Sequence, residues 1–150
     1  MSCRWLLVCA LSTLLAACGP EDPTGELREL IETTEEAAED HKTGFFRELL
    51  SARYTDVRGN DRERVIGFIR GYFLTHQSIE IVTRIETIEL NGIDAAEVSL
   101  LAGLLGQRAG APLLSGFDGR FYDIELEFVE ESGDWRLIGA RWERSLKSWN

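Results

Sequence analysis

The chain has 150 residues, with 16 Lys and Arg against 26 Asp and Glu, so its formal net charge is −10. This length suits one compact domain, and a composition that is 44% hydrophobic and 28% charged is globular rather than disordered or collagen-like. Because an acidic chain repels phosphate backbones and anionic lipid, no nucleic acid partner is expected.

The N-terminus has the features of a secretion signal. Arg4 precedes an apolar run from Trp5 to Ala17, which is shorter than the roughly 20 residues of a membrane-spanning helix. The run ends in Leu15-Ala16-Ala17-Cys18, which resembles the processing box of bacterial lipoproteins. This resemblance implies cleavage between Ala17 and Cys18 and acylation of Cys18. An ordinary cleaved signal, in which Cys18 is incidental, is the alternative.

The same resemblance accounts for the cysteines and the cellular location. Cys3 and Cys9 lie in the predicted signal, residues 1–17, so the mature chain would carry only the acylated Cys18 and no free thiol. Gly19 stands where an Asp would favour the inner membrane, so the resemblance implies anchorage at the periplasmic face of the outer membrane. Residues 18–25 are then predicted to be a lipidated tether and residues 26–150 a single domain.

Three helices are predicted first in the domain. Apolar positions spaced three and four residues apart indicate a first helix that ends near Asp40 and a short second helix that starts at about Thr43. A third helix is expected from Asp61 to His76, with Asn60 and Glu63 as a capping box. Its buried side is predicted to carry Val65, Phe68, Ile69, Tyr72 and Phe73.

Four strands are predicted after Gln77. Alternation from Ile79 changes phase after Thr87, which indicates a bulge, and Asn91-Gly92 predicts a hairpin turn. The later strands are expected at Ala95–Leu105, around Phe121–Phe128 and at Trp135–Glu143, with a loop at 107–119 and a turn at 132–134. On the last strand we expect Trp142 to pack against the helices and Trp135 to lie on the outer side.

This order predicts an α+β fold with three N-terminal helices on a bent antiparallel sheet of about four strands. It resembles the nuclear transport factor 2-like (NTF2-like) superfamily of cone-shaped domains. The segments that carry the resemblance are the exit from the second helix at 49–56, the helix at 64–75 and the ending at 133–142. Members of that superfamily include isomerases, dehydratases, binding proteins and dimeric adaptors, so the fold does not select a function.

Candidate pocket residues are few, and each has a structural alternative. The set consists of Tyr72, His76, Arg84, Asp123 and Trp142. His76 is either a helix cap or core residue, or an acid/base in a pocket. Arg84 and Asp123 are either partners in a structural ion pair or part of an anion-binding pocket. Tyr72 and Trp142 are either core aromatics or ligand contacts.

Other kinds of site are not expected. The sequence has no His pair at helical spacing and no calcium-binding loop, so neither a metal nor a cofactor is predicted, and no residue is assigned as catalytic. The stretch 100–105 is apolar on both faces, which indicates a homodimer surface, a pocket lining or a membrane contact. We therefore expect a lipid-anchored envelope protein whose domain binds a small apolar ligand or a protein partner without catalysis. An isomerase or lyase with an acid/base inside the cone is the alternative.

Overall fold

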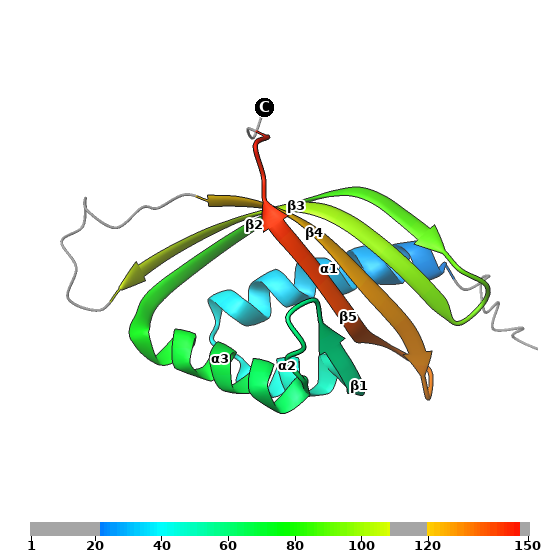
Figure 1. The fold of residues 1–150 in the computed structure, drawn as a ribbon, viewed down its shortest axis with the longest axis horizontal. Helices are drawn as coiled ribbons and strands as arrows, with labels where there is room; N and C mark the ends of the chain where they lie inside the picture. The colour runs from blue at the N-terminus through cyan, green and yellow to red at the C-terminus, as the bar shows by residue number, and fades with distance from the viewer. Residues whose placement is uncertain (1–21, 109–119, 148–150) are drawn as a thin grey trace, which may run out of the picture.

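The computed structural model describes residues 22–108 and 120–147 and has an α+β fold (Figure 1). In chain order the elements are α1 (Pro23–Glu39), α2 (Thr43–Leu49), β1 (Leu50–Asp56), α3 (Arg62–Thr75), β2 (His76–Leu90), β3 (Ala95–Arg108), β4 (Arg120–Glu131) and β5 (Asp134–Arg144). Long, bent strands arch over the helices, which cover one face of the sheet (Figure 1). The core lies between the three helices and that inner face.

The sheet has five strands in the order β1-β5-β4-β3-β2, one more than the sequence predicted. The additional strand is β1, whose residues the sequence indicated only as the exit from the second helix. It pairs parallel with β5, with Leu50 opposite Leu137, so the sheet is mixed rather than wholly antiparallel. By pairing with β5, β1 satisfies backbone groups that would otherwise form an open edge.

α1 begins inside the segment 18–25 that was predicted to be a tether. Asp22 is the N-cap, and its carboxylate accepts a hydrogen bond from the amide of Gly25 at 3.1 Å. Pro23 at the first helical position fits this start because its missing N–H would have no partner there. The helix ends at Glu39, close to the predicted end, and His41 follows with a φ of 55°.

α3 buries only part of the face that the sequence pattern predicted, since Val65 packs against the core. Ile66 is the buried residue of this helix, with 1% of its surface exposed, whereas Phe68 is 58% exposed. The N-cap is Asp61, which accepts from the amide of Arg64 at 2.9 Å, and not the predicted Asn60. Asn60 instead donates its side-chain amide to Asp56 at 2.8 Å.

The predicted bulge and turns are confirmed. The register between β2 and β3 shifts between Ile85 and Thr87, where the sequence changes phase. The β2–β3 turn is closed by a hydrogen bond from the Asn91 amide to the Ala95 carbonyl at 2.8 Å, and Gly92 has a φ of 86°. β3 continues to Arg108, past the predicted start of the 107–119 loop, and the rest of that loop lies outside the described residues.

The expected position of Trp135 on the outer side of the sheet is wrong. A second register shift, between Glu127 and Phe128, changes which β5 residues face the helices. Leu137 therefore lies in the core together with Phe128, and Trp135 and Ala140 pack against it. The Trp135 indole also donates to a Glu26 carboxylate oxygen on α1 at 3.2 Å.

Candidate functional site

An apolar groove lies where α3 ends and β2 begins. Its volume is about 310 Å³, and it is lined by Ala38, Phe46, Phe68, Ile69, Tyr72, Phe73, Ile79, Ile81 and Leu104. These residues come from α1, α2, α3, β2 and β3, so the groove opens between the helical layer and one end of the sheet. Tyr72 supplies the sole polar side-chain atom among the described lining residues.

The groove explains why α3 is rotated relative to its predicted orientation. Phe68, Ile69, Tyr72 and Phe73 border an open space, and they are only partly covered. The sequence grouped these apolar positions correctly. It did not distinguish a face that packs from a face that lines a cavity, because both require the same residue types.

Aromatic side chains build the wall between α2 and α3. The Phe46 and Phe73 rings lie with their centroids 5.9 Å apart in an edge-to-face arrangement. His41, at the corner between α1 and α2, contacts the Phe73 ring edge-on at 5.0 Å. The wall is therefore held by packed rings from the α1–α2 corner, α2 and α3.

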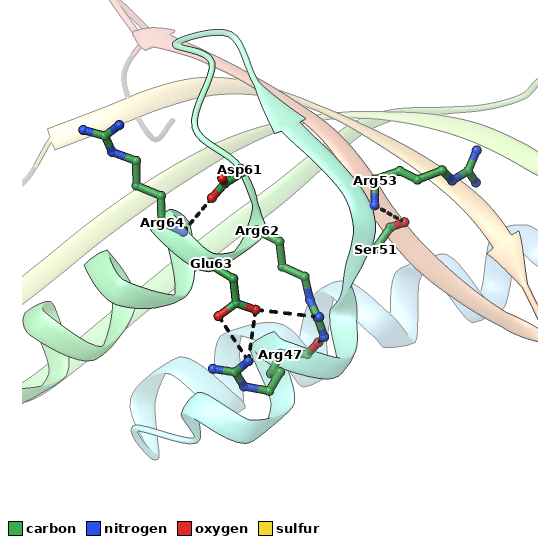
Figure 2. A network of polar contacts seen from close by, with 7 residues as sticks. All are labelled: Arg47, Ser51, Arg53, Asp61, Arg62, Glu63 and Arg64. Atoms are coloured by element: carbon green, nitrogen blue, oxygen red, sulfur yellow. Dashed lines mark hydrogen bonds and ion pairs between the residues drawn. The ribbon is translucent and has the colours of Figure 1, made fainter.

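A polar network ties α2 to the start of α3 (Figure 2). The Arg47 guanidinium contacts the Glu63 carboxylate at 3.1 Å, and Arg62 lies 3.8 Å from the same carboxylate. Arg62 also donates to the backbone carbonyl of Arg47. These contacts therefore link α2 to α3, the helices that carry Phe46 and Phe73.

Tyr72 and His76 form a stacked pair at one end of the groove. Their rings lie 3.8 Å apart with an interplanar angle of 17°. The His76 Nδ1 atom is 2.9 Å from the Tyr72 carbonyl oxygen and 3.1 Å from the Thr75 hydroxyl. A hydrogen bond from Nδ1 to that carbonyl leaves the Nε2 lone pair of the neutral ring available as an acceptor.

The other candidate residues lie elsewhere. Arg84, Leu101 and Asp123 occupy one row across β2, β3 and β4 on the outer face, opposite to the core residues Leu100 and Ala102. Asp123 pairs with Lys147 at 2.9 Å, and Arg84 lies 3.7 Å from Glu86. Leu101, in the middle of the row, is fully buried.

A hollow of about 620 Å³ lies beside this row, and its lining combines Glu86, Asp123 and Lys147 with apolar residues such as Ile124 and Trp142. Lys147 bridges Glu86 and Asp123 there, with its ammonium 2.9 Å from each carboxylate. Hydrogen bonds from Lys147 and from the Ser145 side chain lower the pKa of Asp123, and the same carboxylate, with that of Glu86, raises the pKa of Lys147. The charges of Lys147, Glu86 and Asp123 in this hollow are thus paired with one another.

Trp142 lies on β5 beside Ile124 of β4, and the Arg58 guanidinium is 5.1 Å from the centre of its ring. The five candidate residues therefore occupy three places: Tyr72 and His76 at the groove, Arg84 and Asp123 on the outer face, and Trp142 near the end of β5. In the apolar stretch 100–105, Leu104 lines the groove. The sequence had no signal that joins Ile79, Ile81 and Leu104 to α3, because that contact depends on how the sheet bends.

Within residues 22–108 and 120–147, no group of three or more His, Cys, Asp and Glu side chains could hold a metal ion. No helix in the same part of the chain has the length and apolar character needed to cross a bilayer.

No protein-family model matches the chain, and its sequence matches no curated protein. Solved structures do match. An NTF2-like protein of unknown function from Silicibacter pomeroyi has a TM-score of 0.61 and 15% identity, over 81% of this chain and 95% of that one. A proposed scytalone dehydratase from Novosphingobium aromaticivorans has a TM-score of 0.69 and 8% identity, over 82% and 84%.

A further match is a proposed dehydratase of the NTF2-like family from Streptomyces avermitilis, with a TM-score of 0.68 and 14% identity over 83% of this chain and 97% of that chain. At these identities the likeness concerns the backbone arrangement and not the activity. With three helices under a bent five-stranded sheet and these structural neighbours, the described chain has the NTF2-like fold.

Proposed function

We propose that this chain is a lipid-anchored envelope protein whose NTF2-like domain binds a small apolar molecule in the groove between α3 and the sheet. The observation that carries the binding proposal is the lining of that groove, which is apolar except for the hydroxyl of Tyr72. Binding sites for small molecules are typically concave and mostly apolar, and a volume of about 310 Å³ is at the small end of their range.

The described lining of the groove favours binding over catalysis, because it offers no carboxylate or imidazole for acid–base chemistry. General acid–base chemistry requires a titratable group within hydrogen-bond reach of the substrate, usually with a partner that orients it. No carboxylate or imidazole is among the residues that line the groove. Asp123, the carboxylate considered from sequence, is on the outer face of the sheet and is paired with Lys147.

The test uses two exposed apolar residues of α3. Phe68 lines the groove and is 58% exposed, whereas Leu74 is 80% exposed and does not line it. Since both side chains are largely outside the core, Phe68→Asp and Leu74→Asp should both fold. We expect a neutral fluorescent apolar probe such as Nile red to bind Phe68→Asp much more weakly than the wild type, and Leu74→Asp as well as the wild type. Equal binding by all three proteins would overturn the groove as the site.

The anchorage proposal rests on Leu15-Ala16-Ala17-Cys18. Support for a short tether comes from the start of α1 at Pro23, which leaves residues 19–22 between Cys18 and the helix. In cells supplied with a clickable fatty acid, the wild type should be labelled and Cys18→Ala should remain an unlabelled precursor. Equal labelling of the two would refute acylation at Cys18.

An isomerase or lyase is the second candidate, and the Tyr72–His76 pair is the observation that favours it. Tyr72 lines the groove and its ring stacks on that of His76, and the two neighbours from Novosphingobium and Streptomyces are named as proposed dehydratases. A turnover assay with ketosteroid-like and small hydroxy-ketone substrates separates the two proposals. Activity that is present in the wild type and absent from His76→Ala would establish the enzyme, whereas the binding proposal expects no turnover in either.

A further inference from the structure

The tip of the β2–β3 hairpin exposes apolar side chains that the fold does not use. Ile93, in the turn, is 90% exposed, and Leu90, at the end of β2, is 44% exposed. Turns are normally built from Gly, Asn, Asp, Ser and Pro, as Asn91, Gly92 and Asp94 are here, so an isoleucine among them is unusual. Folding gains almost nothing from this side chain in the single chain.

The hairpin tip is held in place. The Asn91 amide donates to the Ala95 carbonyl at 2.8 Å, which closes the turn. The Asp94 carbonyl accepts from the Glu130 amide on β4, also at 2.8 Å. These bonds to two strands prevent Ile93 from folding back onto the domain.

The tip lies at the same end of the molecule as the start of α1. Near the end of α1, Glu39 accepts a hydrogen bond from the Ile81 amide at 3.2 Å, and one turn earlier Glu35 accepts from Thr83. α1 and β2 therefore run in opposite directions, so the start of α1, at Pro23, lies toward the end of β2. The start of α1 and the β2–β3 hairpin are side by side in Figure 1.

The length of the tether brings this end close to the anchor. Five peptide units join Cys18 to Pro23, and a fully extended chain of that length spans at most about 18 Å. An acyl chain on Cys18 would therefore hold the start of α1, and the hairpin beside it, near the bilayer surface. Leu74, another strongly exposed apolar residue, precedes β2 and lies at the opposite end of that strand.

We propose that the hairpin tip, residues 90–94, is a membrane-contact surface that places Ile93 at the boundary between lipid headgroups and acyl chains. This inference rests on the proposed acylation of Cys18. Glu89, Asp94 and Glu130 lie around the tip, and their carboxylates would be repelled by anionic lipid. We therefore expect the tip to contact a lipid surface that carries no net negative charge. These carboxylates also limit the depth, because charged groups remain in the headgroup region while Ile93 enters the apolar boundary.

The experiment uses the acylated protein reconstituted in vesicles of phosphatidylcholine. Ile93→Cys and Leu74→Cys are purified from membranes and labelled with an environment-sensitive fluorophore. If Cys18 is acylated, the introduced thiol is the one that reacts, because Cys3 and Cys9 leave with the signal. Brominated lipid should quench the probe at residue 93 and leave the probe at residue 74 unquenched. Replacing half of the lipid with an anionic phospholipid should reduce the quenching at 93.

The outcomes separate this proposal from the one on which it rests. If mass spectrometry shows that the purified protein carries no acyl chain, the anchorage and the contact surface both fail. If the protein is acylated and the probe at 93 is quenched no more than the probe at 74, the anchorage stands and the contact surface is refuted. Stronger quenching at residue 93 on anionic than on neutral vesicles would refute the proposal that the tip contacts a neutral lipid surface.

Discussion

A comparison of Ile66→Ala with Phe68→Ala tests the orientation of α3. Ile66 is 1% exposed and belongs to the hydrophobic core, whereas Phe68 is 58% exposed and borders the groove. Truncating a fully buried isoleucine costs about 2–5 kcal/mol, from lost burial and from the cavity that remains. A mostly exposed side chain costs about 0.5 kcal/mol or less, so we expect Phe68→Ala to be nearly neutral.

The assay is urea unfolding of the wild type and the two variants, followed by circular dichroism. The comparison requires that the free energy of unfolding depends on urea concentration with the same slope in all three proteins. Because a domain of this kind has about 5–15 kcal/mol of stability in total, Ile66→Ala should shift the midpoint clearly. The opposite ranking, with Phe68→Ala the more destabilised protein, would show that α3 buries the face that the sequence pattern indicates. It would also remove Phe68 from the groove lining.

Three further perturbations test other contacts. Burial, and then the charge of Asp56, raises the pKa of Tyr54 to about 12, against about 10 in the unfolded chain, so stability should be full below pH 10 and fall as pH rises toward 12. Tyr54→Phe should remove that alkaline loss in a pH series of urea midpoints. Asp56→Ala should cost about 1–3 kcal/mol at neutral pH, because the carboxylate accepts hydrogen bonds from the Arg58 amide and from both nitrogens of Asn60. Burial alone would raise the pKa of Asp56, but these bonds lower it, so the cost should be present above pH 4 and shrink as the carboxylate is protonated in acid. Trp135→Ala should destabilise the domain clearly, since the ring packs against the core, and an unchanged midpoint would place it on the outer face.

The elements and turns could be predicted because their signals are local. The bulge in β2 was visible since the apolar phase changes beside Thr87, and Asn91-Gly92 identifies its turn wherever it occurs. The bulge between Glu127 and Phe128 was not visible. It changes which residues of β5 face the helices, but the sequence around Trp135 alternates in the same way with or without it.

β1 was missed because its signal is nonlocal. Leu50, Tyr54 and Asp56 are buried, but they do not alternate regularly, and the register with β5 shifts between Leu50 and Thr55. What makes the segment a strand is the unpaired edge of β5, which comes about 80 residues later in the chain. The polar contacts of Ser51 and Arg53 with Glu131 are nonlocal as well, so no rule based on sequence spacing could pair these residues.

The arrangement of the two proposed surfaces constrains how a ligand could reach the groove. Ile81, in the groove, and Leu90, at the hairpin tip, are separated by nine residues of β2, which is roughly 30 Å along the strand. If the hairpin tip contacts the bilayer, the groove opens at most about that far from the lipid surface, since β2 bends at its bulge, and it lies toward the opposite end of the domain from the anchor. A ligand would then arrive through water or from a partner protein rather than by lateral entry from the membrane. This geometry favours a small molecule with measurable solubility over a diacyl lipid, in keeping with a groove of about 310 Å³.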